Sequence, residues 1–490
     1  MAPDKVLVVG AGPAGLALAC GLLQHGIPVR VIDKASGPAT TSRANFLHAR
    51  GSEVLDRLAA LGDLPQRSVR AMRITTYLGD KPVMRIRFGD PGMHTAAPPM
   101  VISQADVEAA LRDRLAELGG QIDWGAPLVD VRQDESGVTA TVGEDDIRTA
   151  WLVGCDGAGS TTRRLAGIGF PGVKLSERFL LADVTLDWDL DRTGTTGWIH
   201  PTGMIGAMPM PGGTWRIIAY DPGQPAEKPT EAEILARLEQ ILPDRTGRDV
   251  RIREASWLSM FTVHRRLADT YRHGRLLIAG DAGHTHAPFG GQGMLTGLGD
   301  AENLAWKLAL VCDGRADSAL LDTYEAERRP LATEVLRSTS AVTKVNVAQG
   351  RFGRFLRDRV VVPIVNLPAV QRWVTYQTSQ LWVNYRKGPL AGSSLFTRRP
   401  RPGDRVPDCE CIRTDGTSVR LYAELRGRWA VLGSDTVFDS ARAHLGDRVV
   451  LLPAADRDTL LIRPDGHLAW RGEHAHEADD WLRTALSGTA

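Results

Sequence analysis

The most restrictive feature of the sequence is a glycine-rich loop close to its start. Gly10-Ala11-Gly12-Pro13-Ala14-Gly15 follows the apolar run Val6 to Val9. We expect a buried parallel strand that ends at the glycines, and a helix over residues 13–24. Pro28 to Ile32 predicts a second strand, which Asp33 closes. This order of strand, glycine turn, helix and strand is typical of a βαβ unit that binds a dinucleotide.

Each part of this loop has a physical task. The first glycine allows a tight turn, the second lets the backbone approach a pyrophosphate, and the third lets helix and strand pack closely. The N-terminus of the helix offers N–H groups and partial positive charge to phosphates. Asp33 stands where an acidic residue bonds ribose hydroxyls. The residues predicted to hold this half of the ligand are Gly10, Gly12, Pro13, Ala14, Gly15, Asp33 and Lys34.

A second glycine-rich segment lies far downstream. Arg275 to Ala279 predicts a strand that leads into Gly280-Asp281, and Pro288-Phe289-Gly290-Gly291-Gln292-Gly293 follows. Asp281 is well placed to hold a polyol hydroxyl, and the bare backbone before the helix predicted from about Met294 to Cys312 can stabilise negative charge on a bound ring. A reduced flavin is such a ring. The two segments together favour FAD over NAD.

Three further polar residues have two interpretations each. Asp156 follows the predicted strand Thr149 to Gly154 and either makes the turn there or serves the ligand. Arg43 either reaches the pyrophosphate as a bidentate donor or is a solvated loop arginine. Gln104, at the start of a helix that Ser103 can cap, has the same ambiguity. His284 and His286 invite a catalytic-base role, but a structural role in a tight turn is favoured.

An antiparallel sheet is predicted from about Phe179 to Tyr220, where short apolar runs alternate with glycine and proline. Its aromatic and thioether content is unusual and includes Trp198, Met204, Met208, Met210 and Trp215. They are either ordinary sheet core or the lining of a large apolar pocket, and both interpretations stay open. The substrate-pocket candidates are Trp198, Met204, Met208 and Trp215, with Phe289 from the later loop.

The bulk composition excludes several classes of partner. A formal net charge of +1 over 490 residues gives no support for nucleic-acid binding. No apolar run approaches the ~20 residues that span a bilayer, and the early strand leaves no room for a signal peptide. The five cysteines are scattered, which argues against a disulfide framework and fits the cytoplasm. No metal cluster is predicted. The two cysteines of Cys409-Glu410-Cys411 have the wrong spacing for a CxxC redox or zinc pair.

These motifs resemble the FAD-dependent aromatic hydroxylases, single-component flavoprotein monooxygenases related to p-hydroxybenzoate and phenol hydroxylase. The resemblance rests on the first loop with Asp33, on Ser42-Arg43-Ala44, on Gly154-Cys155-Asp156-Gly157 with Ser160 and Arg163, on Gly280 to His284, and on the GGQG loop. The pattern from Pro464 to Arg471 is similar to the thioredoxin-like tail of the larger members. Bacterial members often tailor aromatic polyketides or modify aromatic antibiotics.

The resemblance implies an α/β fold in three parts. We expect a Rossmann-like FAD-binding domain over residues 1–177 and 271–390, with a segment at about 70–102 that joins an inserted substrate domain. That antiparallel sheet domain covers 178–270. After a linker over 389–402, residues 391–490 form a thioredoxin-like domain without CxxC, for which no redox role is expected.

The resemblance also implies residue roles. Arg43 and Gln104 contact the pyrophosphate or ribityl region, Asp156 supports a turn that serves FAD and NADPH, and Asp281 bonds the ribityl chain. The flavin pyrimidine edge faces backbone from Pro288, Gly291, Gly293, Met294 and Leu295. Met294-Leu295 is a departure, because many relatives have Leu-Asn there.

The implied activity is hydroxylation of a large aromatic small molecule with NADPH or NADH and O₂, through a flavin C4a-hydroperoxide. No protein side chain is assigned as catalytic, because the flavin carries the chemistry. Baeyer–Villiger oxidation or epoxidation on the same scaffold stays open, and so does a flavoprotein that binds a ligand without turnover. A flavin-dependent halogenase is disfavoured because no WxWxIP motif is present. A monomer and a homodimer are both compatible with the sequence.

Overall fold

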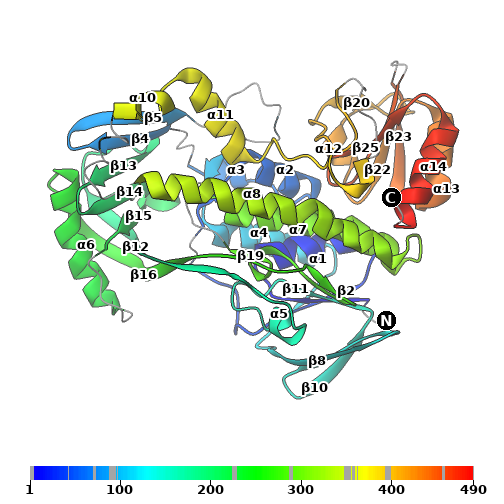
Figure 1. Ribbon diagram of the computed structural model, residues 1–490, viewed down its shortest axis with the longest axis horizontal. Coiled ribbons are helices and arrows are strands. Elements are labelled where there is room, and N and C mark those ends of the chain that lie inside the picture. Colours follow the sequence, from blue (N-terminus) through cyan, green and yellow to red (C-terminus); the bar gives the residue numbers. More distant parts are fainter. Residues whose placement is uncertain are drawn as a thin grey trace.

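The computed structural model places three β-sheet regions along the long axis of the molecule (Figure 1). It describes residues 5–41, 44–69, 73–87, 95, 98–222, 229–285, 291–346, 355, 359–360, 362–391, 399–454 and 458–488. The six-stranded sheet that carries the glycine loop is central, a larger sheet lies to the left in Figure 1, and the C-terminal sheet lies to the right.

The central sheet is parallel except at one edge. Its strand order is β17 (Arg272–His273), β18 (Leu276–Ile278), β11 (Trp151–Gly154), β1 (Val6–Val9), β2 (Val29–Asp33) and β7 (Ile122–Trp124). All pairs are parallel except β17 with β18. Because β1, β11 and β18 are adjacent and parallel, the loops after Val9, Gly154 and Ile278 emerge at the same edge.

Helices pack on this sheet through apolar faces. Helix α1 (Pro13–Gln24) contacts α7 (Gly293–Cys312) and α4 (Gln104–Glu117). The predicted cap of α4 is present, because Ser103 Oγ accepts a hydrogen bond from the Ala105 N–H at 3.2 Å. The remaining short elements nearby are β3 (Phe46–Leu47), α2 (Ala49–Arg57), α3 (Leu64–Arg67), β6 (Met100–Val101), β8 (Leu128–Asp134), β9 (Gly137–Val142), β10 (Asp145–Thr149), α5 (Thr161–Leu165), η3 (Gly280–Ala282) and η4 (Ser318–Leu321).

The second sheet has eight strands drawn from distant parts of the chain. Their order is β19 (His284–Thr285), β16 (Arg251–Leu267), β12 (Gly172–Asp187), β15 (Trp215–Tyr220), β14 (Gly203–Pro209), β13 (Gly194–His200), β4 (Arg73–Leu78) and β5 (Lys81–Arg87). The short helix η2 (Pro211–Gly213) connects β14 to β15. In Figure 1 the early strands β4 and β5 lie beside the later β13. The domain boundaries themselves stay a prediction.

One face of this sheet is covered by α6 (Glu231–Thr246). Thr230 and Glu233 form a capping box at its start. The apolar side chains Ile234 and Leu238 pack on the core residues of the covered face. The alternate residues of each strand point to the opposite face, since strand side chains have a period of two. The sheet therefore has one closed face and one that is free of α6.

Three further helices follow the central domain. The long helix α8 (Asp322–Asn346) crosses the molecule, and α10 (Val362–Val365) and α11 (Pro368–Ser379) lie above β5 (Figure 1). Asn366 Oδ1 accepts a hydrogen bond from the Arg85 N–H at 3.1 Å, which ties this segment to the edge strand. These elements make the described part of this stretch mainly helical.

The C-terminal domain has a thioredoxin-like sheet. Its order is β23 (Val449–Leu452), β22 (Trp429–Leu432), β24 (Thr459–Ile462) and β25 (Leu468–Gly472), and only β22 and β23 are parallel. The other elements are η6 (Pro389–Ala391), β20 (Glu410–Ile412), β21 (Ser418–Arg420), α12 (Leu421–Glu424), α13 (Asp435–Leu445), η7 (Gly446–Arg448) and α14 (Ala475–Leu486).

A buried network of charges joins this domain to the rest of the chain. The Arg463 guanidinium donates to both oxygens of Glu327 on α8, at 2.7 and 3.0 Å, and also pairs with Asp465. Lys307 on α7 donates to Glu327 at 2.8 Å. Burial alone would raise the pKa of Glu327, but Arg463 and Lys307 outweigh it and lower the pKa to about 2. The pairs are mutually satisfied, so the geometry is specified tightly.

Neither a membrane-spanning helix nor a metal-binding cluster is evident in the described part of the chain. Each described helix is too short or too polar to cross a bilayer. No group of three or more His, Cys, Asp or Glu side chains there is arranged to hold a metal ion.

Removing the central cation of the buried network should destabilise the fold strongly. We expect Arg463→Met to lower the free energy of unfolding by about 3–5 kcal/mol, because Glu327 and Asp465 would lose a partner while buried. The matched control is Arg132→Met, whose exposed pair with Asp146 contributes less than about 1 kcal/mol. Urea unfolding followed by circular dichroism measures both, and equal losses in the two variants would contradict the prediction.

Candidate functional site

The first glycine turn is shaped by contacts that exclude any side chain. Gly10 has φ +107°, and a Cβ there would lie 2.5 Å from the carbonyl oxygen of Cys155. A Cβ on Gly15 would lie 1.9 Å from the carbonyl oxygen of Gly10. These contacts agree with the tasks expected of the two glycines: the first allows the tight turn, and the third lets helix and strand pack closely. Gly12, in contrast, has nothing within 4 Å of its Cβ position, which leaves open space beside the N-terminus of α1.

The acidic residue at the end of β2 braces this turn. Asp33 Oδ2 accepts from the Ala11 N–H at 2.7 Å, and its Oδ1 accepts from the Ala35 N–H at 2.8 Å. Lys34 is exposed. Gln104 donates from Nε2 to Glu108 within its own helix at 2.8 Å. Arg43 lies outside the described residues.

The second turn, after β11, is held by its own carboxylate. Asp156 Oδ2 accepts from the N–H groups of Thr161 and Thr162 at 2.8 and 3.0 Å, so it caps α5. Its Oδ1 is buried and has no hydrogen-bond partner within the described residues. Arg163 donates to the carbonyls of Ala158 and Ala282, at 2.9 and 2.8 Å, and so ties the second turn to the third.

The third turn, after β18, packs directly on the first. Gly280 has φ +63°, and a Cβ there would lie 2.9 Å from the Ala14 Cβ. A Cβ on Gly297 of α7 would lie 3.4 Å from both Ala14 Cβ and Gly280 Cα. Asp281 follows on an exposed position, with no side-chain hydrogen bond or ion pair to any residue that the structure describes. The two distant glycine segments are therefore neighbours.

Asp300 is a buried residue that the sequence analysis missed. Its Oδ2 accepts from the Gly280 N–H at 3.1 Å and contacts His284 Nε2 at 2.6 Å, and its Oδ1 accepts from Arg328 Nε at 2.7 Å. Burial alone would raise the pKa of Asp300, but Arg328 and His284 outweigh it and lower the pKa. The available signal was an acidic residue seven positions after Gly293, within the apolar first half of the helix.

The hydrogen bond with Asp300 gives His284 a structural role in the third turn. It is 1% exposed and its Nε2 is bonded to Asp300. That position agrees with the structural role favoured for it. His286 lies outside the described residues.

The second glycine-rich segment packs against Phe46 through Gly291. Its φ is +61°, and a Cβ there would lie 2.8 Å from the Phe46 Cβ. Gly293 begins α7, and Met294 and Leu295 are buried at 7% and 1% exposure. Pro288 and Phe289 lie outside the described residues. The helix start is fixed in part by Gln380, whose amide donates to Gln292 Oε1 at 3.1 Å.

The candidate pocket residues separate onto the two faces of the eight-stranded sheet. Trp198 and Trp215 belong to the closed core beneath α6, at 2% and 3% exposure, and both pack on Trp188. Their side chains point away from the face without α6, because they alternate with Met204 and Met208 along paired strands. The two tryptophans therefore lie in the sheet core, and of the described candidates a pocket proposal keeps the two methionines.

Met208 connects the sheet to the cofactor-binding region. Asn45 donates from Nδ2 to its sulfur at 3.2 Å, and the adjacent Phe46 contacts the Gly291 position. On the same face, Arg216 Nε and Nη2 donate to Asp183 at 2.7 and 2.6 Å. Gly206 leaves space there, because its Cβ position has one atom within 4 Å, at 3.9 Å. A chain of contacts thus runs from Gly291 through Phe46 and Asn45 to the sheet face without α6.

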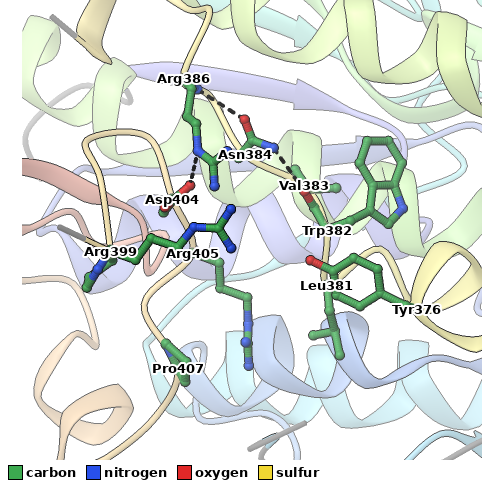
Figure 2. Close-up of a pocket in the computed structure, with 11 residues that line it drawn as sticks. Tyr376, Leu381, Trp382, Val383, Asn384, Arg386, Arg399, Asp404, Arg405 and Pro407 are labelled. Carbon is green, nitrogen blue, oxygen red and sulfur yellow. Dashed lines mark hydrogen bonds and ion pairs between the residues drawn. The ribbon is translucent and has the colours of Figure 1, made fainter. Parts of the chain in front are cut away.

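A separate pocket of about 790 Å³ lies where α11 approaches the C-terminal domain (Figure 2). Figure 2 shows Arg386 pointing to Asp404, with Arg399 and Arg405 nearby. The described lining is Tyr376, Leu381, Trp382, Val383, Asn384, Arg386, Arg399, Pro400, Asp404, Arg405 and Pro407. This lining includes none of the residues predicted to hold the cofactor, so the volume alone does not identify the site.

The residues present fit FAD. Open space at Gly12 leaves room for a pyrophosphate beside a helix N-terminus. The exposed Asp281 carboxylate and the buried, unsatisfied Asp156 Oδ1 are acceptors at the same sheet edge. Hydroxyl-rich ribose and ribityl chains supply donors of the kind that these carboxylates need.

Comparison with known families agrees with this geometry. The model of the FAD binding domain matches residues 4–339, more than half of the chain. The model of the aromatic-ring hydroxylase C-terminal domain matches residues 399–489.

Individual relatives cover nearly the whole chain. A rifampicin monooxygenase from Streptomyces venezuelae is 34% identical and covers 99% of both chains. The 6-methylpretetramide 4-monooxygenase of Streptomyces rimosus is 39% identical over 96% of this chain and 91% of its own. Among solved structures, the anhydrotetracycline hydroxylase OxyS from Streptomyces rimosus matches with a TM-score of 0.80 at 32% identity, over 98% of this chain and 99% of that one.

The three-turn site, the FAD-domain match and these full-length relatives agree with the resemblance first drawn from the motifs. The chain belongs to the FAD-dependent aromatic hydroxylases and is a flavoprotein monooxygenase.

Proposed function

We propose that the protein uses NADPH or NADH and O₂ to hydroxylate a large aromatic substrate of polyketide or antibiotic type, through a flavin C4a-hydroperoxide. The observation that carries this proposal is the contact chain from the GGQG loop through Phe46 and Asn45 to Met208. It would set the largely apolar sheet face without α6 beside the predicted flavin edge. The named relatives, which act on rifampicin and tetracycline-type molecules, support a large substrate.

The cofactor roles follow from the three turns. The open backbone at Gly12 and the N-terminus of α1 would hold the pyrophosphate, with Arg43 as a further donor. Asp281 would bond the ribityl chain, and backbone at Gly291 and Gly293 would face the flavin pyrimidine edge. Asp33 would serve the ribose while it braces the Ala11 N–H. The adenosine half of the cofactor would also contact Gly10, Pro13, Ala14, Gly15 and Lys34. The flavin half would also contact Pro288, Met294 and Leu295.

The substrate would lie against the face of the eight-stranded sheet that α6 leaves free. Met204 and Met208 offer adaptable apolar contact there. The Arg216–Asp183 pair adds a polar group, 1% exposed at the arginine and 17% at the aspartate, that can orient a phenol or carbonyl oxygen. The bound flavin supplies oxygen transfer, whereas the protein binds the ring close by and excludes water.

A second candidate reaction uses the same site. Baeyer–Villiger oxidation or epoxidation would need the same cofactor and the same apolar face, so the position of the inserted oxygen distinguishes them. We also propose a cytoplasmic location, which the five free cysteines support.

The function is tested by cofactor analysis and substrate-dependent turnover. We expect the purified protein to be yellow and to release FAD on denaturation. Polycyclic aromatic compounds should stimulate NADPH or NADH oxidation and gain one oxygen atom, measured by mass spectrometry, with its position assigned by NMR. A protein that cannot be loaded with FAD would refute the proposal. An oxygen atom inserted into a ring, or an epoxide product, would instead support the second candidate reaction.

Gly12→Ala should weaken FAD binding without harming the fold. Its methyl group would enter space where no protein atom lies within 4 Å, so it would meet only the pyrophosphate. We expect Kd for FAD to rise ~10-fold or more, equivalent to about 1.4 kcal/mol. The contrasting variant is Gly15→Ala, whose Cβ overlaps the Gly10 carbonyl and should prevent stable folding. Fluorescence titration gives Kd and thermal unfolding of the apoprotein gives stability; unchanged affinity in Gly12→Ala would exclude this pyrophosphate position.

Asp281→Ala should also reduce FAD affinity with the fold intact. A hydrogen bond to a charged acceptor contributes about 1.5–3 kcal/mol, so Kd should rise ~10- to 100-fold. The matched control is Asp113→Ala, another exposed aspartate, which lies on α4. Equal FAD affinities of the two variants would remove Asp281 from the ribityl contact.

A further inference from the structure

Two cysteines in the C-terminal domain meet in the folded chain. The Sγ atoms of Cys409 and Cys411 lie 3.7 Å apart, on the hairpin formed by β20 and β21. They are separated by one residue, so both project from the same side of an extended segment. Their spacing excludes a CxxC motif but still brings two thiols into contact. The fold thus creates a dithiol that the sequence pattern did not predict.

The hairpin holds this dithiol at the surface on a fixed base. Both side chains are partly buried against a core cluster that contains Val406 and Leu421. The preceding residue, Asp408, accepts hydrogen bonds from Arg420 Nε at 2.8 Å and from the Tyr422 N–H at 2.9 Å. The segment is therefore anchored through Asp408, and both cysteine residues are partly exposed. Small molecules can reach them without unfolding of the domain.

The other cysteines provide an internal comparison. Cys20 and Cys155 are fully buried, whereas Cys312 is partly buried and has no neighbouring thiol among the described residues. Burial raises the pKa of Cys312 to about 12. A hydrogen bond with Cys411 lowers the pKa of Cys409 to about 7. The thiolate is the reactive form, so the contact between two partly exposed sulfurs marks this pair as the site of oxidation, with Cys409 as the first thiol to ionise.

We propose that Cys409 and Cys411 form a peroxide-oxidisable dithiol that closes to a disulfide. The Cys409 thiolate attacks one oxygen of hydrogen peroxide, the O–O bond breaks, and after protonation the products are a sulfenic acid and one water. Cys411 then attacks the Cys409 sulfur, the S–O bond breaks, and the disulfide forms with release of a second water. Two thiols thus lose two electrons and two protons in total, and one peroxide is reduced to two waters.

A metal site is a weaker explanation of the same pair. Structural zinc takes four ligands, and no group of three or more suitable side chains gathers within the described ranges. Hydrogen peroxide also has a local source, since reduced flavin and O₂ yield it when no substrate accepts the oxygen. The presence of this peroxide source rests on the proposed function, whereas the contact between the two thiols does not.

The test uses reduced holoenzyme and added hydrogen peroxide. After quenching by alkylation, intact mass and peptide mapping should show loss of two hydrogen atoms and a link between Cys409 and Cys411, reversed by dithiothreitol. We expect this reaction to be at least ~10-fold faster than oxidation of Cys312, because little of the Cys312 thiol is ionised. Rates equal to that of Cys312 would overturn the proposal, whether or not the protein turns over a substrate.

Three single variants separate the two steps. Cys411→Ser should stop the reaction at the sulfenic acid of Cys409, which dimedone traps. Cys409→Ser should abolish fast oxidation, and Cys312→Ser, the matched control, should leave the disulfide yield unchanged. A Cys409→Ser protein that still consumes peroxide rapidly at Cys411, or a Cys411→Ser protein without dimedone adduct, would refute the assigned order.

Discussion

The site depends on a contact that only very small residues can make. Ala14, Gly280 and Gly297 come from α1, the turn after β18, and α7, and their Cβ positions lie within 2.9 to 3.4 Å of neighbouring atoms. A larger side chain at Gly280 would have to push these elements apart, since protein interiors are close-packed. The contact therefore sets the distance between the first glycine turn and the segment that carries Asp281, the two parts proposed to hold one extended cofactor.

Buried charged side chains then connect these turns to one another and to neighbouring helices. Asp300 joins the third turn, His284 and α8 through Arg328, and Arg163 joins the second and third turns through two carbonyls. Such groups are costly to bury unless each is paired, so a partly formed arrangement is disfavoured. A similar network of Glu327, Arg463 and Asp465 seats the C-terminal domain on α7 and α8. That domain is thereby part of the same rigid framework, although it contributes none of the predicted cofactor residues.

Much of this architecture was predictable because it rests on local signals. The strand, the glycine turn and Asp33 follow each other within 30 residues, and the C-terminal strands are short apolar runs between turns. The pocket was harder to predict, because Trp198 and Met208 lie on different strands, and the strand register together with the position of α6 decides which face each occupies. Asp300 was missed for a related reason, since its partners Gly280 and Arg328 lie 20 and 28 residues away.

The sequence by itself determined the dinucleotide-binding unit, the second glycine segment and the family, because these depend on residue types at fixed short spacings. The tertiary structure alone decided which parts meet: the glycine segments at Ala14, the sheet face beside the GGQG loop, and the two sulfurs of Cys409 and Cys411. Short spacings reflect backbone geometry, which is local. Contacts between distant segments depend on packing and on the pairing of buried charges, and no single stretch of sequence encodes either.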